Sequence, residues 1–297
     1  MKKIKIGTHH NELALYHANH TLQQLSNLGV EAELTTFHSK GDKAKHFPFD
    51  KPNDGDLLTT EIEVALLRGE VDFAVRTLQD LPTAQPNGLV LAGVSKRESP
   101  AEWLLMRKND LADDQLFSLK EKATVGVSST RRKAQMFDFR PDVVFKEMTG
   151  NESDCLENLR LGNFDAIILA GENINSLGLD VSDLFVLKFN PREFIPAPAQ
   201  GILAYQCCET DLEIRRLLKQ LHRPETAAVS NVERKILELM GGDLQMSIGV
   251  YCEQDANSHY HVWAAYAKTW DAPLKRVRLS SSTNFNLAER VVEMLNE

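Results

Sequence analysis

The sequence predicts an α/β protein with two similar α/β units and a small α+β unit at its C-terminal end. Short apolar strands alternate with amphipathic helices through the first two-thirds of the chain, and this pattern restarts near residue 100. From about residue 222 the pattern changes, and the sequence predicts a run of antiparallel strands with a helix on either side. With 297 residues, the chain is long enough for two or three such units.

The first unit opens with the strand IKIGT, and an amphipathic helix follows that Gly29 ends. Because strands alternate with helices here, we expect a parallel sheet with both faces covered. The expected strands are residues 4–8, 30–37 and 71–75, and the expected helices are residues 11–28 and 60–67.

The second unit repeats this alternation, and DAIILA is its clearest buried strand. Its expected strands are residues 123–127, 143–148 and 165–170, with helices at 128–137 and 154–161. The Pro-rich segment FIPAPAQG, residues 194–201, indicates a crossover or hinge.

The remaining residues predict helices at 211–221, 226–240 and 287–295, with antiparallel strands at 248–254, 259–267 and 276–282. We therefore expect domain 1 to comprise residues 1–98 with 196–217, domain 2 residues 99–195, and domain 3 residues 222–297.

Composition excludes several classes of protein. The net charge is −8 and no third of the chain is net basic, so a nucleic-acid partner is not expected. No apolar run has the roughly 18 residues of a membrane helix, and no secretory signal is recognised, so we expect a cytoplasmic protein without a membrane partner. Its four cysteines are expected to be reduced.

Ligands of open α/β sheets bind beyond the carboxyl ends of the strands, and this rule selects four segments. They are residues 8–11, 76–80, 128–132 and 149–151.

The segment from Ser128 to Arg132 is the best candidate for an anion site. Ser128 and Ser129, the amides of a helix N-terminus and the side chains of Arg131 and Arg132 converge there, and these groups suit a carboxylate or phosphate. In the alternative, the serines only cap the helix and the arginines face solvent.

Asp80 follows a strand beside Arg76 and is a candidate general acid or base, or else a turn residue before Leu81 and Pro82. His17 and His20 lie one turn apart on a helix near His9 and His10, but no carboxylate or cysteine completes a ligand set. We therefore expect no metal site.

In this order, the segments resemble the porphobilinogen deaminase (hydroxymethylbilane synthase) family. IGTHHNELAL, HSKGD, EIEVALLRGEVDFAV, RTLQDLP, GVSSTRRKAQ, GNFDAIILA, PAPAQG, ETAAVSNVER and SIGVY carry the resemblance over about 250 residues. The resemblance implies two domains like those of periplasmic binding proteins and a small α+β third domain. It also implies a role in tetrapyrrole and haem biosynthesis, in which four porphobilinogen molecules are joined on a dipyrromethane cofactor, and a monomeric protein.

The resemblance places the catalytic aspartate at Asp80. It places binding of substrate and cofactor carboxylates at Arg131, Arg132, Ser128, Ser129, Gly150, Asn151 and Gln200, with His9 and Asn11 replacing a family arginine and serine. Uncharged residues replace further basic residues of the family at Gln79, Thr149, Cys155 and Ser176.

The largest departure concerns the cysteine that holds the cofactor by a thioether. Its place in the segment GGDLQ falls on Leu244 or Asp243, neither of which has a thiol, so the resemblance predicts that dipyrromethane is absent here. We expect a family member with impaired or absent catalysis that binds a porphobilinogen-like or other small polycarboxylate. The alternatives are an active synthase with an unusual primer attachment, and a non-catalytic clamp for a small anionic metabolite.

Overall fold

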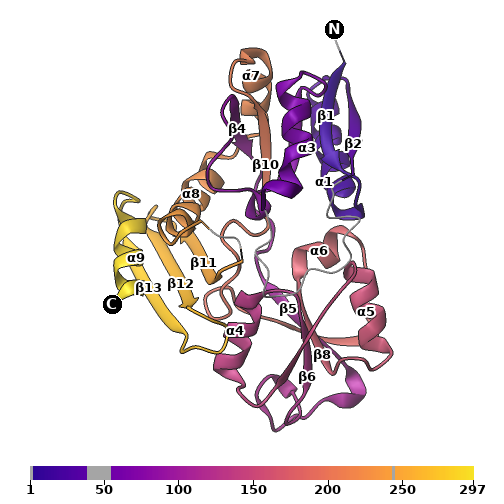
Figure 1. Ribbon diagram of the computed structural model, residues 1–297, viewed down its shortest axis with the longest axis vertical. Coiled ribbons are helices and arrows are strands. Elements are labelled where there is room, and N and C mark those ends of the chain that lie inside the picture. The colour runs from indigo at the N-terminus through magenta and orange to yellow at the C-terminus, as the bar shows by residue number, and fades with distance from the viewer. Residues whose placement is uncertain (1–2, 39–54, 243–244) are drawn as a thin grey trace.

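The computed structural model describes residues 3–38, 55–242 and 245–297, which form three sheets with their helices (Figure 1). The first and second sheets have five strands each and the third has three. The predicted class is thereby confirmed, because two α/β domains are followed by a small α+β domain. The residue boundaries that we predicted between the domains stay predictions.

The first sheet has the strand order β2-β1-β3-β10-β4. Helices α1 and α7 pack on one of its faces through Leu25 and Leu218, and α3 packs on the other through Ile62. The strands are β1 (Ile4–His9), β2 (Ala32–Phe37), β3 (Phe73–Thr77), β4 (Leu89–Val94) and β10 (Leu203–Cys208). The helices are α1 (Glu12–Asn27), α3 (Gly55–Leu67), the short η1 (Leu78–Asp80) and α7 (Leu212–Leu221).

The second sheet has the order β7-β6-β8-β5-β9. Helix α5 buries Leu156 and Leu159 on one face, and α4 buries Met136 on the other. The strands are β5 (Glu102–Arg107), β6 (Thr124–Val127), β7 (Val144–Glu147), β8 (Ala166–Ala170) and β9 (Leu184–Lys188). The helices are α4 (Thr130–Phe139), α5 (Glu152–Arg160) and α6 (Gly171–Ser176), with single turns η2 (Lys108–Asp110) and η3 (Leu116–Ser118).

Both large sheets are mixed, so the expected purely parallel sheet is wrong. In the first sheet β10 runs antiparallel to β3 and β4, and in the second β5 runs antiparallel to β8 and β9. Strands β5 and β10 are the first to follow a passage of the chain from one domain to the other. No helix precedes them that would return the chain in the parallel sense, so each enters its sheet in the opposite direction.

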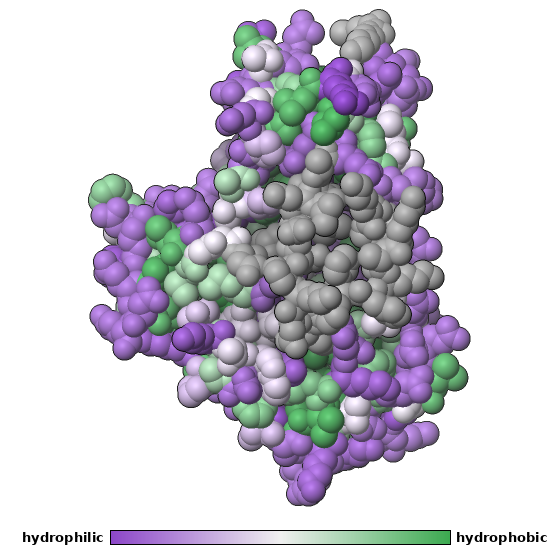
Figure 2. Space-filling model, in the orientation of Figure 1, coloured by the Kyte–Doolittle hydropathy of each residue, from purple (hydrophilic) through white to green (hydrophobic). Residues whose placement is uncertain are grey.

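The third domain is a meander with two helices on one face. Its antiparallel strands are β11 (Ser247–Gln254), β12 (Tyr260–Ala267) and β13 (Lys275–Ser281). Helices α8 (Pro224–Leu239) and α9 (Leu287–Asn296) bury Ile236, Leu237 and Val291 against this sheet. The visible face of this domain is mainly hydrophilic, and its apolar residues lie in small separate groups (Figure 2).

The two segments that cross between the α/β domains run side by side. The amide of Glu98 donates to the carbonyl of Gly201 at 2.8 Å, and the amide of Ser95 donates to that of Leu203 at 2.9 Å. Gly201 has φ +78°, and a Cβ there would lie 3.0 Å from the carbonyl oxygen of Glu98. The expected hinge at residues 194–201 is therefore one of two paired crossing segments.

A buried carboxylate of the third domain fastens both crossing segments. Glu233 of α8 is fully buried and accepts from the Arg97 guanidinium at 2.6 Å and from the amide of Ala199 at 2.6 Å. It also accepts from the amide of Cys252 in β11 at 2.7 Å. The Glu233 side chain thus connects α8 and β11 of the third domain with both crossing segments.

We predict that Glu233→Ala lowers the free energy of unfolding by about 3–5 kcal/mol, because the Arg97 guanidinium is left buried without its partner. Urea unfolding followed by circular dichroism measures this change. Glu238→Ala on the same helix is the matched control, because Glu238 is exposed and, among the described residues, forms its ion pair with the partly exposed Lys235. A Glu233→Ala loss no larger than that of the control would contradict the fastening role.

Candidate functional site

A cleft of about 1600 Å³ lies between the two α/β domains. The first domain contributes the turn after β1, one side of α1 and the end of β3. The second contributes the start of α4, the turn between β7 and α5, and α6. All four segments that follow strand ends in our sequence analysis supply residues to this cleft, because strand ends of both sheets face it.

Asp80 lies on the cleft wall at the end of η1 and is exposed to the cleft. The hydroxyl of Thr77 donates to its carboxylate. Protein surrounds this position on several sides, and the reduced hydration raises the pKa of Asp80, whereas the Thr77 hydroxyl and the nearby Arg76 charge act in the opposite direction. A carboxyl group in this setting is suited to giving and taking a proton.

Arg131 and Arg132 both pair with one buried carboxylate. Glu102 of β5 is fully buried, with its Oε1 atom 2.5 Å from Nη2 of Arg131 and its Oε2 atom 2.9 Å from Nη2 of Arg132. Burial alone would raise the pKa of Glu102, but the charges of Arg132 and Arg131 outweigh burial and lower it to about 2. Neither arginine lines the cleft.

The Arg131 guanidinium also has a structural partner in the second crossing segment. Its Nη1 donates to the carbonyl of Ile195 at 3.0 Å. The two guanidinium groups are therefore largely occupied inside the protein, and Glu102, which occupies them, was not among the predicted site residues. Glu102 lies in the mainly apolar strand EWLLMR. A single carboxylate in such a strand was the only feature of the sequence that could have indicated a buried partner for the two arginines.

The two serines before α4 have different roles. Ser129 is the N-cap and its hydroxyl accepts from the amide of Arg132, whereas Ser128 lines the cleft and accepts from Nη1 of Arg132 at 3.3 Å. Thr130 donates to the carbonyl of Gln245 at 2.7 Å, which holds that end of the GGDLQ segment beside the start of α4.

The other predicted site residues also line the cleft, several of them with structural roles. Asn11 caps α1, and Asn151 forms a capping box with Asp154 at the start of α5. Gly150 has φ +98° in the turn before that helix. Gln200 is buried and donates to the carbonyl of Pro100 at 2.9 Å, and His9 lies half-buried at the end of β1.

The described residues give the cleft a negative charge. Three Lys or Arg residues line it, namely Arg76, Lys96 and Arg223. Eight carboxylates line it, namely Glu12, Asp80, Glu98, Glu147, Glu152, Asp154, Glu157 and Glu172. Glu147 ends β7, and the other carboxylates lie on helices or on the first crossing segment, so only the assembled structure shows that all eight line one cavity.

A sequence model described as "Porphobilinogen deaminase, dipyromethane cofactor binding domain" matches residues 4–216. The chain belongs to the porphobilinogen deaminase family. This confirms the resemblance derived from the sequence motifs.

Two porphobilinogen deaminases illustrate the similarity. The protein of Desulforamulus reducens is 36% identical over 257 residues, which cover 86% of this chain and 81% of that protein. The protein of Streptococcus sanguinis is 34% identical over 298 residues, which cover 99% of this chain and 96% of that protein. Among solved structures, the periplasmic aliphatic sulphonate binding protein SsuA of Escherichia coli has a TM-score of 0.44 and 16% identity, covering 81% of this chain and 70% of that one.

The cleft of this porphobilinogen deaminase family member offers no cysteine thiol for a dipyrromethane group. None of the four cysteines lines the cleft, and Cys252 is buried in the core of the third domain. Burial also raises the pKa of the Cys155 and Cys207 thiols, each to about 11. Asp243 and Leu244 lie outside the described residues, and neither side chain can form a thioether. The residues present do not fit covalent attachment of dipyrromethane.

Within residues 3–38, 55–242 and 245–297, no three His, Cys, Asp or Glu residues are grouped so that they can hold a metal ion. No helix in this part of the chain combines the length and apolar character that crossing a membrane requires.

We predict that Glu102→Gln lowers the free energy of unfolding at pH 7 by about 3 kcal/mol, because it leaves two buried guanidinium groups without an anion. Glu102 has a lowered pKa in the folded state. Its contribution is therefore fully present above about pH 4.5 and is lost as the pH falls toward 2. Urea unfolding should show that the two proteins differ less in free energy of unfolding below pH 4 than at pH 7.

Glu121→Gln is the control, because Glu121 is exposed in the same domain. A pH-independent loss in Glu102→Gln would indicate a packing defect and contradict the electrostatic role.

Proposed function

We propose that this chain is a porphobilinogen deaminase family protein that carries no covalently bound dipyrromethane and does not polymerise porphobilinogen. The observation that carries the proposal is the absence of any cysteine from the lining of the cleft. A thioether needs a thiol that reaches the cavity where the chain grows, and none of the four cysteines is among the residues that line the cleft.

The electrostatics of the cleft support the same proposal. Each pyrrole of the family substrate carries two carboxylates, and a buried carboxylate without a charged partner costs several kcal/mol. Arg131 and Arg132 are paired with Glu102, and the described cleft residues carry an excess of negative charge. A growing polypyrrole would be repelled rather than neutralised.

Asp80 favours a second candidate function, an active hydroxymethylbilane synthase with an unusual primer attachment. It lies exposed in the cleft with a raised pKa, as an acid-base group for pyrrole chemistry requires. Asp80 alone neither anchors a primer nor binds its carboxylates, so this candidate ranks second. Under either candidate we propose a monomeric, cytoplasmic protein associated with tetrapyrrole biosynthesis.

We predict that the intact mass of the purified protein equals that of the unmodified chain. We also expect a negative Ehrlich reaction and no consumption of porphobilinogen. The Streptococcus sanguinis relative, purified in the same way, is the positive control. A mass increase corresponding to two linked pyrroles, or consumption of porphobilinogen at a rate within about tenfold of the control, would overturn the first candidate in favour of the second.

A further inference from the structure

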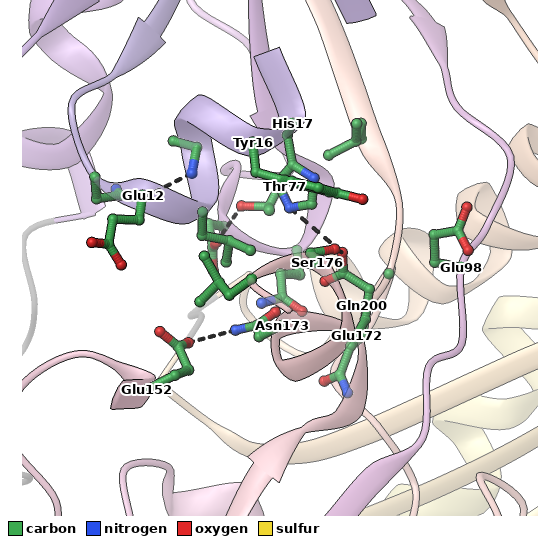
Figure 3. A pocket seen from close by; sticks show the side chains of 18 of the residues that line it. Glu12, Tyr16, His17, Thr77, Glu98, Glu152, Glu172, Asn173, Ser176 and Gln200 are labelled. Carbon is green, nitrogen blue, oxygen red and sulfur yellow. Dashed lines mark hydrogen bonds and ion pairs between the residues drawn. The ribbon is translucent and has the colours of Figure 1, made fainter. Parts of the chain in front are cut away.

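A serine, a histidine and an aspartate form a hydrogen-bonded chain on the surface of the third domain. The Oγ atom of Ser280 in β13 lies 2.7 Å from Nδ1 of His261 in β12. The Nε2 atom of the same imidazole lies 3.3 Å from Oδ2 of Asp255, which follows the end of β11. None of the three residues is among those that line the cleft, whose side chains Figure 3 shows in part.

The register of the third sheet brings the serine and the histidine together. His261 is paired with Ser280 across β12 and β13, so both side chains leave the sheet on the same face. Val262, the next residue of β12, is buried in the core that α8 and α9 cover. Because neighbouring residues of a strand point to opposite faces, His261 and Ser280 lie on the face opposite these helices.

A tight turn holds the carboxylate of Asp255 in place. Its Oδ1 atom accepts from the amide of His259 at 2.9 Å and from the amide of Asn257 at 2.8 Å. The backbone hydrogen bond from His259 has the largest effect on this carboxyl group, and it lowers the pKa of Asp255. The carboxylate is therefore ionised at neutral pH and can only accept hydrogen bonds, which leaves Oδ2 to the imidazole.

The ionised carboxylate fixes the tautomer of His261. Since Asp255 has no proton to donate, the hydrogen of the neutral imidazole lies on Nε2 and is donated to Oδ2. Nδ1 then carries a lone pair, and the Ser280 hydroxyl donates to it. A nucleophile next to a base that a third group orients is the arrangement that activates a serine, and it is recognised by its geometry on unrelated folds.

The edge of the sheet supplies a donor for the oxygen that becomes negative during acyl transfer. Strand β13 is an edge strand, because the strand order is β11-β12-β13. Alternate residues of such a strand direct their amides away from the partner, so one of the neighbours Ser280 and Ser281 has an outward N–H. Among the described residues, neither amide takes part in a backbone hydrogen bond outside the sheet. An N–H in this position can stabilise a tetrahedral intermediate.

Arg278 places a positive charge on the same face. It lies two residues before Ser280 on β13, so the two side chains project from one side of the sheet. Its guanidinium is 5.4 Å from the centroid of the Trp263 ring. In the described part of the chain it forms no ion pair with a carboxylate. The guanidinium is therefore available to a carboxylate of a substrate.

We propose that Ser280, His261 and Asp255 hydrolyse small carboxylic esters that carry a negatively charged group, which Arg278 binds. The Ser280 oxygen attacks the ester carbonyl carbon while its proton passes to Nδ1 of His261. The bond from that carbon to the alcohol oxygen breaks, and the alcohol leaves with the proton. Water then attacks the acyl-serine, its proton passes through His261 to the serine oxygen, and the carboxylic acid is released.

This proposal goes beyond the proposed function, because it concerns a separate site in the third domain. It does not depend on whether porphobilinogen binds in the cleft or is consumed.

The test is hydrolysis of 4-acetoxybenzoate by the full chain at pH 8, measured from the absorbance of the released 4-hydroxybenzoate. We expect saturable turnover. Ser280→Ala and His261→Gln should each lower kcat by about a hundredfold or more, because a positioned base contributes roughly 10²–10⁴-fold and the triad acts as a unit. Arg278→Gln should raise KM about tenfold with kcat unchanged, because it removes binding that is uniform along the reaction.

Ser282→Ala is the matched control, because Ser282 is exposed next to the end of β13 and should leave both constants unchanged. Asp255→Asn keeps the shape of the side chain but not its charge. It should lower kcat while the circular dichroism spectrum and the urea midpoint stay those of the unmodified protein, which separates loss of catalysis from loss of folding.

A covalent readout distinguishes catalysis from a structural hydrogen bond. A fluorophosphonate should add one phosphonyl group to Ser280, with fluoride as the leaving group, and peptide mass spectrometry locates it. His261→Gln should lose this labelling. No hydrolysis above the rate in buffer, equal kcat values for Ser280→Ala and Ser282→Ala, or labelling at a residue other than Ser280 would each overturn the proposal. None of these results bears on the intact mass and porphobilinogen measurements that test the proposed function.

Discussion

The ion pair between Glu233 and Arg97 is the interaction on which the domain arrangement depends. Arg97 lies on the first crossing segment, and the same carboxylate holds the amides of Ala199 on the second crossing and Cys252 in the third domain. A charge in a fully buried position is tolerated only where its lone pairs are satisfied. Glu233, a residue of the third domain, thus helps to hold the two α/β domains in the arrangement that forms the cleft, although the third domain contributes least to the walls of the cleft.

A second buried carboxylate, Glu102, determines the chemistry that the cleft has available. By pairing with both Arg131 and Arg132, it converts two candidate ligand-binding cations into supports for β5 and the second crossing segment. Among the described residues, the cleft keeps Asp80 and is lined by more carboxylates than Lys or Arg side chains.

Periodicity in the sequence predicted the helices well because their apolar faces and caps are local features. Asn11 and Ser129, which cap α1 and α4, lie within one residue of the predicted starts of these helices, whereas α5, capped by Asn151, begins two residues before its predicted start at residue 154. Strands β4, β5, β9 and β10 were not predicted, because short apolar runs next to crossing segments do not show with which sheet they pair. The direction of β5 and β10, and with it the mixed character of both sheets, is a property of long-range connection rather than of local sequence.

For the candidate site, too, local features were predictable from the sequence and long-range contacts were not. The rule of strand ends located the segments that line the cleft, because it depends only on the order of strands and helices. The partner of the two arginines could not be found this way, since Glu102 lies 29 residues from Arg131 along the chain. His17 attracted attention as a possible metal ligand, but its neighbour Glu172 becomes visible only when α1 and α6 meet.

The paired crossing segments also make the second domain an insertion within the first. At its boundary the amide of Phe189 donates to the carbonyl of Glu102 at 2.9 Å, so the chain leaves this lobe beside the point where it entered. A lobe with adjacent ends is exchangeable as a cassette, because a graft needs to match only one short pair of junctions. The first lobe lacks this modularity: without β10, which arrives after the insertion, its sheet has a gap between β3 and β4.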